Sequence, residues 1–89
     1  MVSITYVSSA VFPFSETTLL DLVAQCQRNN EKLGVTGILV YSDGNFIQVI
    51  EGGDLVTHAL YDRIRLDARH RAVTTVAQQL IDVREFQGW

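Results

Sequence analysis

Residues 35–52, VTGILVYSDGNFIQVIEG, have the pattern of two strands joined by a tight turn. The first run, residues 35–41, is mostly apolar and bounded by turn signals, which indicates a buried strand. Asp43-Gly44 is a residue pair that favours a two-residue hairpin. Residues 46–50 then form the returning antiparallel strand. The stretch therefore predicts a β-hairpin in the middle of the chain.

Helical patterns flank this hairpin on both sides. Ser15 can cap the helix before it, with Glu16 near the positive end, and Gly34 closes its polar exit. Asp54 is the expected N-cap of the helix after it. Each helix carries one apolar stripe at helical spacing. The stripes consist of Leu19, Leu22, Val23 and Cys26 in the first helix and Val56, Ala59, Leu60 and Ile64 in the second.

Two outer strands complete the pattern. Residues 2–8 alternate, so that Val2, Ile4, Tyr6 and Ser8 share one face. Residues 73–81 form a weaker strand candidate because Gln78-Gln79 interrupts the apolar run. The order β-α-β-β-α-β predicts an α+β sandwich of the ferredoxin-like type, with both helices on one face of a mixed sheet. The 89 residues fit one domain, residues 1–89.

The composition of the chain argues against nucleic acid and membranes as binding partners. Seven basic residues against ten acidic ones, a net charge of −3, argue against nucleic-acid binding through bulk charge. No apolar run approaches the ~20 residues of a membrane span, and no leader opens the chain. The single cysteine, Cys26, excludes an internal disulfide and fits a reducing compartment. We expect a cytoplasmic domain that binds neither nucleic acid nor membrane.

Gln48 and Tyr6 are the first candidate site residues. Gln48 shares a strand face with Phe46 and Ile50, and if that face is buried its amide needs partners that a ligand could supply. Alternation alone leaves solvent exposure of Gln48 equally open. Tyr6 by default is a core tyrosine bonded to a backbone carbonyl. A Tyr–Gln pair on adjacent strands, however, could hold two hydrogen-bond arrangements.

Polar clusters at the two helix exits are the other candidates. Asn29-Asn30 by default caps a helix C-terminus, but its amides could also face a planar heterocycle. Arg69-His70, with Arg63 and Asp67 on the preceding turns, usually means a solvated charged face. Alternatively, Arg69 could bind a phosphate bidentately.

Enzyme signatures are poor. The sequence has no Gly-rich phosphate loop, no nucleophile elbow and no His/Cys cluster at metal-ligand spacing. An acylphosphatase-like hydrolase would need an arginine-bearing loop after the first strand, where Ser8-Ser9-Ala10-Val11 offers no such residue. We therefore expect a binding or sensing domain without catalytic activity or metal.

Taken together, the motifs resemble one family over essentially the whole chain. ITYVS at residues 4–8, RNN at 28–30, VTGILVY at 35–41 and FIQVIEG at 46–52 are similar to the BLUF domains, sensors of blue light using FAD. Further matches are Tyr61, Arg63-Ile64, Asp67, Arg69-His70, Arg84, Phe86 and Trp89.

The resemblance implies a cofactor and its contacts. BLUF domains hold a flavin, usually FAD, with FMN the other candidate, between the two helices. Tyr6 and Gln48 would be the photoactive pair, Tyr6 transiently donating an electron and a proton while Gln48 changes orientation or tautomer. The other implied flavin contacts are Asn30 and Asn29 at the ring, Ser8 and Ile64 lining it, and Arg63, Asp67, Arg69 and His70 near the ring edge and the phosphate, with Arg69 the expected phosphate contact.

The resemblance also implies an output. It predicts a blue-light photoreceptor that signals to a separate protein and can self-associate. The alternative is a flavin-free ferredoxin-like module for ligand binding or interaction. The family's short final strand, which contains a methionine, is not found before the chain stops at Trp89, and the only methionine is Met1. We therefore expect that strand to be missing and a sheet edge to be exposed.

Overall fold

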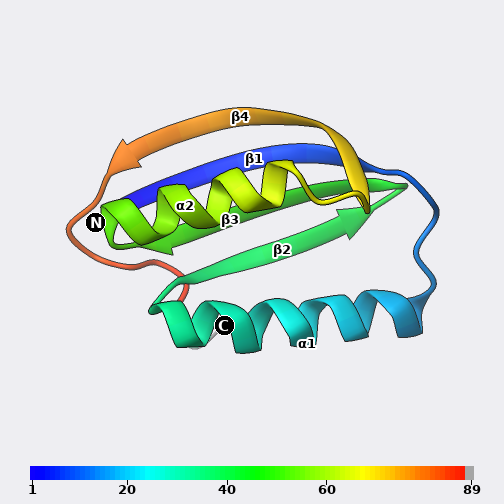
Figure 1. Ribbon diagram of the computed structural model, residues 1–89, viewed down its shortest axis with the longest axis horizontal. Helices are drawn as coiled ribbons and strands as arrows, with labels where there is room; N and C mark the ends of the chain where they lie inside the picture. Colours follow the sequence, from blue (N-terminus) through cyan, green and yellow to red (C-terminus); the bar gives the residue numbers. More distant parts are fainter. Residues whose placement is uncertain (88–89) are drawn as a thin grey trace.

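A computed structural model describes residues 1–87 and confirms the predicted order of elements (Figure 1). The chain forms β1 (Val2–Ala10), α1 (Glu16–Leu33), β2 (Thr36–Ser42), β3 (Asn45–Gly52), α2 (Asp54–Arg65) and β4 (His70–Leu80). Both helices contribute to one cavity with the same face of the sheet, which confirms that they cover a single face. No helix among the described residues is long and apolar enough to cross a membrane.

The sheet has the order β2-β3-β1-β4, and every neighbouring pair is antiparallel. The expected mixed sheet is therefore wrong in this detail. The α1 crossover makes β1 and β2 parallel to each other, but β3 lies between them and runs against both. As a result β3, which carries Gln48, is a central strand with hydrogen-bonded neighbours on both sides.

The predicted hairpin between β2 and β3 is confirmed. Ser42 pairs with Asn45, and the two residues between them, Asp43 and Gly44, have φ values of 51° and 80°. Positive φ at both central positions is what a type I′ hairpin turn requires. Gly37 is needed further along, because a Cβ there would lie 1.9 Å from the carbonyl oxygen of Val49. This hairpin fixes the register that points Gln48 toward the helices.

The helix ends differ in two places from the sequence prediction. Ser15 caps α1 as expected, accepting a 3.1 Å hydrogen bond from the backbone N–H of Thr18. Asn29 and Asn30 are inside α1, and the C-cap is Gly34, whose φ is 68°. The N-cap of α2 is Gly53, which leaves Asp54 as the first helical residue. There the Asp54 carboxylate still complements the positive end of the helix dipole.

The core lies between the helices and the two central strands. Ile4 on β1 and Ile50 on β3 are fully buried and paired directly across the sheet. By contrast β4, at the edge, is exposed along most of its length and begins three residues earlier than predicted. Its pairing with β1 shifts register twice, and Ala72 has a positive φ of 55°. Such bulges are typical of edge strands.

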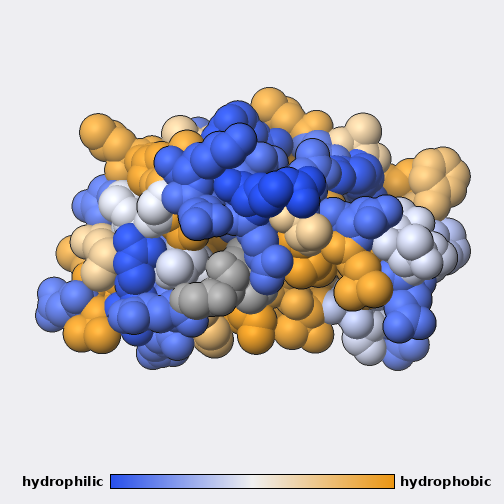
Figure 2. All heavy atoms as spheres, turned by 90° about the horizontal axis from the view of Figure 1, so that it is seen from below, coloured by the Kyte–Doolittle hydropathy of each residue, from blue (hydrophilic) through white to orange (hydrophobic). Residues whose placement is uncertain are grey.

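The helix-free face of the sheet is partly apolar. Alternation places Ile38, Val40 and Ile47 there, and they are 37%, 47% and 48% exposed. Hydrophobic side chains also gather along the lower edge of the molecule in Figure 2. After β4 the chain turns back without forming a helix or strand through residue 87, and the Ile81 N–H bonds to the carbonyl of Met1. The turn carries the chain back toward the start of β2 (Figure 1).

Candidate functional site

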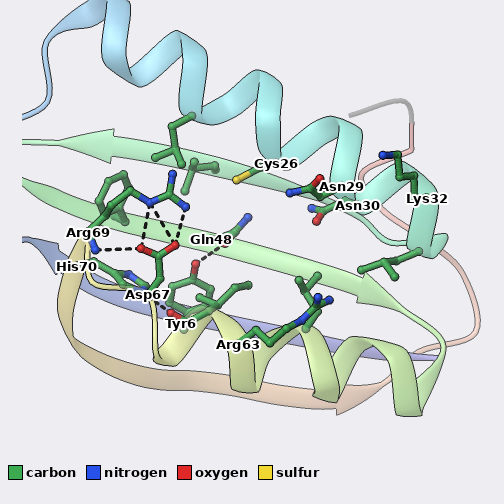
Figure 3. A pocket seen from close by; sticks show the side chains of 16 residues that line it. Tyr6, Cys26, Asn29, Asn30, Lys32, Gln48, Arg63, Asp67, Arg69 and His70 are labelled. Atoms are coloured by element: carbon green, nitrogen blue, oxygen red, sulfur yellow. Dashed lines mark hydrogen bonds and ion pairs between the residues drawn. The ribbon is translucent and has the colours of Figure 1, made fainter.

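A cavity of about 430 Å³ lies between α1 and α2, with the sheet as its floor (Figure 3). This volume is within the range typical of small-molecule sites. Its lining comes from both helices, from β1, β2 and β3, and from the segment that leads from α2 into the start of β4. The lining residues are Tyr6, Leu22, Cys26, Asn29, Asn30, Lys32, Leu33, Leu39, Phe46, Gln48, Leu60, Arg63, Ile64, Asp67, Arg69 and His70.

Tyr6 and Gln48 form the centre of the floor. They pair directly across β1 and β3, and each is 3% exposed. The Tyr6 hydroxyl donates a hydrogen bond to Oε1 of Gln48. The structure thus shows that the Gln48 side chain faces the helices, which alternation left open. Phe46 and Ile50 are buried on the helix side of β3, and Gln48 shares their strand face.

The phenol of Tyr6 is held in its neutral form. Burial raises its pKa well above the usual value, and the nearby Cys26, Tyr61 and Asp67 raise it further. A neutral phenol is a hydrogen-bond donor, which matches the bond to Gln48. The proton in this pair therefore stays on Tyr6 at neutral pH.

Two amide groups offer unused donors to the cavity. Asn30 is 4% exposed, and its buried Nδ2 has no hydrogen-bond partner among residues 1–87. Gln48 uses only Oε1, so its Nε2 also has no partner in that part of the chain. Cys26, Asn29 and Asn30 project from α1 toward the cavity, facing Gln48 across it (Figure 3). Since buried amide donors cost free energy when unpaired, the site fits a ligand that brings acceptor atoms.

The end of the cavity next to β4 is already paired within the protein. Arg69 Nε lies 3.0 Å from Oδ1 of Asp67 and Nη2 lies 2.5 Å from Oδ2, while Nη1 donates to Gln25. This pairing holds the pKa of the Asp67 carboxyl below its usual value. At 48% and 31% side-chain exposure, the two groups remain accessible to solvent. The guanidinium of Arg69 therefore enters the site with its donors largely engaged.

His70 is fixed by contacts on both ring nitrogens. Nδ1 lies 2.8 Å from the hydroxyl of Ser8, and Nε2 contacts the carbonyl oxygen of Ile64. Because a carbonyl only accepts, Nε2 carries the proton and, in the neutral ring, Nδ1 accepts from Ser8. Ser8 is buried behind His70 and is not among the cavity-lining residues. It supports the wall instead of forming it.

Lys32 and Arg63 lie toward the other end of the cavity. Figure 3 shows them on the side away from Arg69, Lys32 on α1 and Arg63 on α2. Neither forms an ion pair or a side-chain hydrogen bond within residues 1–87. Arg63 was expected at the site, whereas Lys32 was not, although it follows Asn29 by three residues and so shares its helix face.

The apolar walls of the cavity come largely from residues that were not predicted to lie at the site. Leu22 and Cys26 were assigned to the apolar stripe of the first helix, and these two members of it line the cavity. The signal was present, because Leu22, Cys26, Asn29 and Leu33 recur every three or four residues and place polar and apolar groups on one face. Burial raises the pKa of the Cys26 thiol, although Arg69 opposes the shift. The other unpredicted lining residues are Leu39, Phe46 and Leu60.

A family model described as "Sensors of blue-light using FAD" matches residues 1–89. The chain belongs to the BLUF family. BLUF domains bind a flavin, so the flavin that the resemblance implied is confirmed as the cofactor of this family. The cavity between the helices is the part of this domain where such a ligand would fit. The two unpaired amide donors fit such a ring system, whose carbonyl oxygens and ring nitrogens accept hydrogen bonds.

Curated relatives of this BLUF domain include much longer proteins. Photoactivated adenylate cyclase subunit beta of Euglena longa is 36% identical over 86 residues, which is 97% of this chain but 10% of that protein. Subunit alpha of Euglena gracilis is 35% identical over 97% of this chain and 8% of that protein. The chain therefore spans about a tenth of the length of the curated relatives that it matches.

Solved structures match the fold closely. BlrB, a BLUF protein in its dark state, superposes with a TM-score of 0.90 at 31% identity, covering 99% of this chain and 67% of that one. BlrP1 of Klebsiella pneumoniae, solved with FMN and cyclic diGMP, gives 0.89 at 31% identity, covering 98% of this chain and 23% of that one. The ferredoxin-like fold and membership of a blue-light sensor family are both established.

Proposed function

We propose that this BLUF domain is a light-operated switch whose photoactive pair is Tyr6 and Gln48, with a flavin in the cavity between α1 and α2. The observation that carries this proposal is the Tyr6–Gln48 hydrogen bond at the cavity floor, which leaves Nε2 of Gln48 free to face a ligand. Asn30 adds a second unused donor nearby. The domain then signals to a separate protein, and it can pair with itself through exposed sheet surface.

The residues that hold the flavin divide by chemistry. Nδ2 of Asn30 and Nε2 of Gln48 would donate to ring acceptors, with Asn29 beside them. Apolar walls, including Ile64 on α2, would exclude water from the ring. When bound, the flavin supplies blue-light absorption and, once excited, a one-electron oxidant. The rest of the switch is chemistry of the polypeptide.

Tyr6 supplies the electron and the mobile proton. Its buried neutral phenol can release an electron only if the proton also moves, and the hydrogen bond to Gln48 Oε1 provides a path. When both return to Tyr6, Gln48 can be left rotated or as the other tautomer, with donor and acceptor roles exchanged. The outcome is a second hydrogen-bond arrangement at the cavity floor, which defines a two-state element.

The phosphate-bearing tail of the flavin could lie at either of two ends of the cavity. Arg69 is the contact expected from the resemblance, but its donors are engaged by Asp67 and Gln25. Lys32 and Arg63, which form no ion pair or side-chain hydrogen bond within residues 1–87, lie at the other end. We therefore assign the phosphate to Lys32 and Arg63, and keep Arg69, Asp67 and His70 as the fixed wall near the ring edge.

Comparing FMN with riboflavin, which lacks the phosphate, tests this assignment. Arg63→Gln and Lys32→Gln should each weaken FMN binding several-fold while leaving riboflavin binding unchanged, because one charge–phosphate contact is worth about 1 kcal/mol or more. Arg69→Gln is the matched control and should affect both ligands alike. Loss of FMN preference in the Arg69 variant alone would return the phosphate to that residue.

The function itself is tested by absorption spectroscopy. Purified protein should carry, or take up, FAD, and blue light should shift its absorption reversibly. The alternative, a flavin-free interaction module, predicts a folded and colourless protein that does not bind added FAD. That result would overturn the proposal.

A further inference from the structure

The carboxylate of Glu51 is the most deeply buried charged group among the described residues, at 1% exposure, and it lies outside the cavity. Glu51 pairs across the sheet with Ser3 and Thr36, and it is three residues along β3 from Gln48. An odd spacing on a strand puts two side chains on opposite faces. Gln48 therefore faces the helices, whereas the Glu51 side chain is on the helix-free face.

Three donors converge on this carboxylate. The Thr36 hydroxyl donates to Oε1 at 2.8 Å. The backbone N–H of Phe86 donates to Oε1 at 2.8 Å, and that of Glu85 donates to Oε2 at 3.1 Å. Two successive backbone N–H groups directed at one carboxylate hold the chain after β4 against β3.

Arg84 ties the same segment to the neighbouring strand. Its Nη2 donates to the carbonyl oxygen of Gly34 at 2.7 Å, just before β2. Its Nη1 donates to the Thr36 hydroxyl at 2.9 Å and to the backbone carbonyl of Glu51 at 3.1 Å. One rigid guanidinium thus spans the ends of β2 and β3. A small slide of β3 against β2 would stretch one of these bonds beyond hydrogen-bond length.

We propose that Glu51 and Arg84 form a latch that holds residues 84–86 on the helix-free face and releases them when β3 shifts at Gln48. The latch is a positioning device, and β3 is the single element shared by Gln48 and the carboxylate, about 10 Å apart along the strand. The release of residues 84–86 on illumination rests on the proposed function, whereas their anchoring in the dark does not. The segment after β4 thereby becomes the surface that reports the state of the site.

Amide hydrogen exchange in the dark tests the anchor. Glu51→Gln should speed exchange of the Glu85 and Phe86 amides at least tenfold, because one acceptor oxygen becomes an N–H donor. Arg84→Gln, which replaces a half-buried side chain and puts the fold at less risk, should do the same. Asp82→Asn, an exposed carboxylate in the same segment, is the control and should leave both rates unchanged. Unchanged rates in both the Glu51 and the Arg84 variants would overturn the latch.

Illumination of the flavin-loaded protein tests the coupling. Blue light should speed exchange at Glu85 and Phe86 in the wild type, while Gln48→Leu should remove this effect and keep the dark protection. A normal spectral shift with identical exchange in light and dark would overturn the coupling but leave the proposed function intact. Absence of any spectral shift would overturn the proposed function, and the dark experiment would still decide the anchor.

Discussion

The floor of the cavity and its wall next to β4 use polar groups in opposite ways. On the floor, the buried side chains of Gln48 and Asn30 each have an amide nitrogen with no hydrogen-bond partner among residues 1–87. At the wall, Asp67 and Arg69 satisfy each other while remaining partly exposed. Buried donors without partners are costly, whereas exposed ion pairs contribute little. The comparison indicates that the polar groups of the floor are available to bind a ligand and to change hydrogen-bond partners. Those of the wall keep the partners that they already have.

The largest effect should come from the core that packs beside Gln48 on the helix side of the sheet. Ile50→Ala removes a fully buried side chain next to Gln48 and should lower the free energy of unfolding by about 2–5 kcal/mol. Ile47→Ala, on the same strand but facing away and 48% exposed, should cost less than about 1 kcal/mol. Urea denaturation of both variants measures the difference. Equal losses would mean that the floor is not held by the core.

Variants of Asn30 and Asn29 test whether the buried amide contributes more to flavin affinity than its exposed neighbour. Asn30→Ala should raise the dissociation constant of the flavin about tenfold, as expected for one buried hydrogen bond. Asn29→Ala, at an exposed neighbouring position on the same helix, should change it by less than about threefold. Fluorescence quenching of added flavin gives both values. The reverse ranking would place the ring against Asn29 instead.

Cys26 reports on access to the cavity. Burial raises the pKa of its thiol, so the reactive thiolate is scarce at neutral pH. At pH 8 its alkylation should be about tenfold slower than that of a free cysteine. Saturating flavin should slow it further. Reaction at the free-thiol rate in flavin-loaded protein would contradict the proposed position of the ligand.

The smallest effect is expected at the wall. Arg69 lowers the pKa of Asp67, so their pair stabilises the fold above the ordinary carboxyl pKa of ~3.9 and loses this contribution as pH falls through the lowered pKa. Arg69→Gln should therefore destabilise by less than about 1 kcal/mol at pH 7, and by less than that at pH 2, where Asp67 is closer to being protonated. Urea midpoints at both pH values test this. A loss that grew toward low pH would show that another group carries the effect.

The fold could be predicted from the sequence because the patterns that indicate its strands and turns are local. The Asp43-Gly44 turn and the alternation of residues 2–8 depend on neighbours a few positions apart, and both were confirmed. The direction of Gln48 was not accessible from alternation, because Ile47 and Val49 are as apolar as Phe46 and Ile50. Only the pairing of β3 with β1 and β2 decides which set is buried.

The errors share one physical cause, which is dependence on partners far away in the chain. The antiparallel sheet follows from where β3 inserts, and the cavity-facing role of Leu22 and Cys26 follows from how far α1 stands from the sheet. Lys32 reads as an ordinary helix-end lysine until Arg63 is placed across from it. The Glu51 latch joins positions more than thirty residues apart and has no sequence signature.

Gln48 on the cavity floor is the group that we propose to switch. The most direct measurement is the light-minus-dark absorption spectrum of Gln48→Leu loaded with FAD, beside the wild type at equal flavin content. We predict bound flavin with no light-induced shift in the variant, because leucine keeps the volume but has no donor or acceptor to exchange. A shift of wild-type size in Gln48→Leu would contradict the claim.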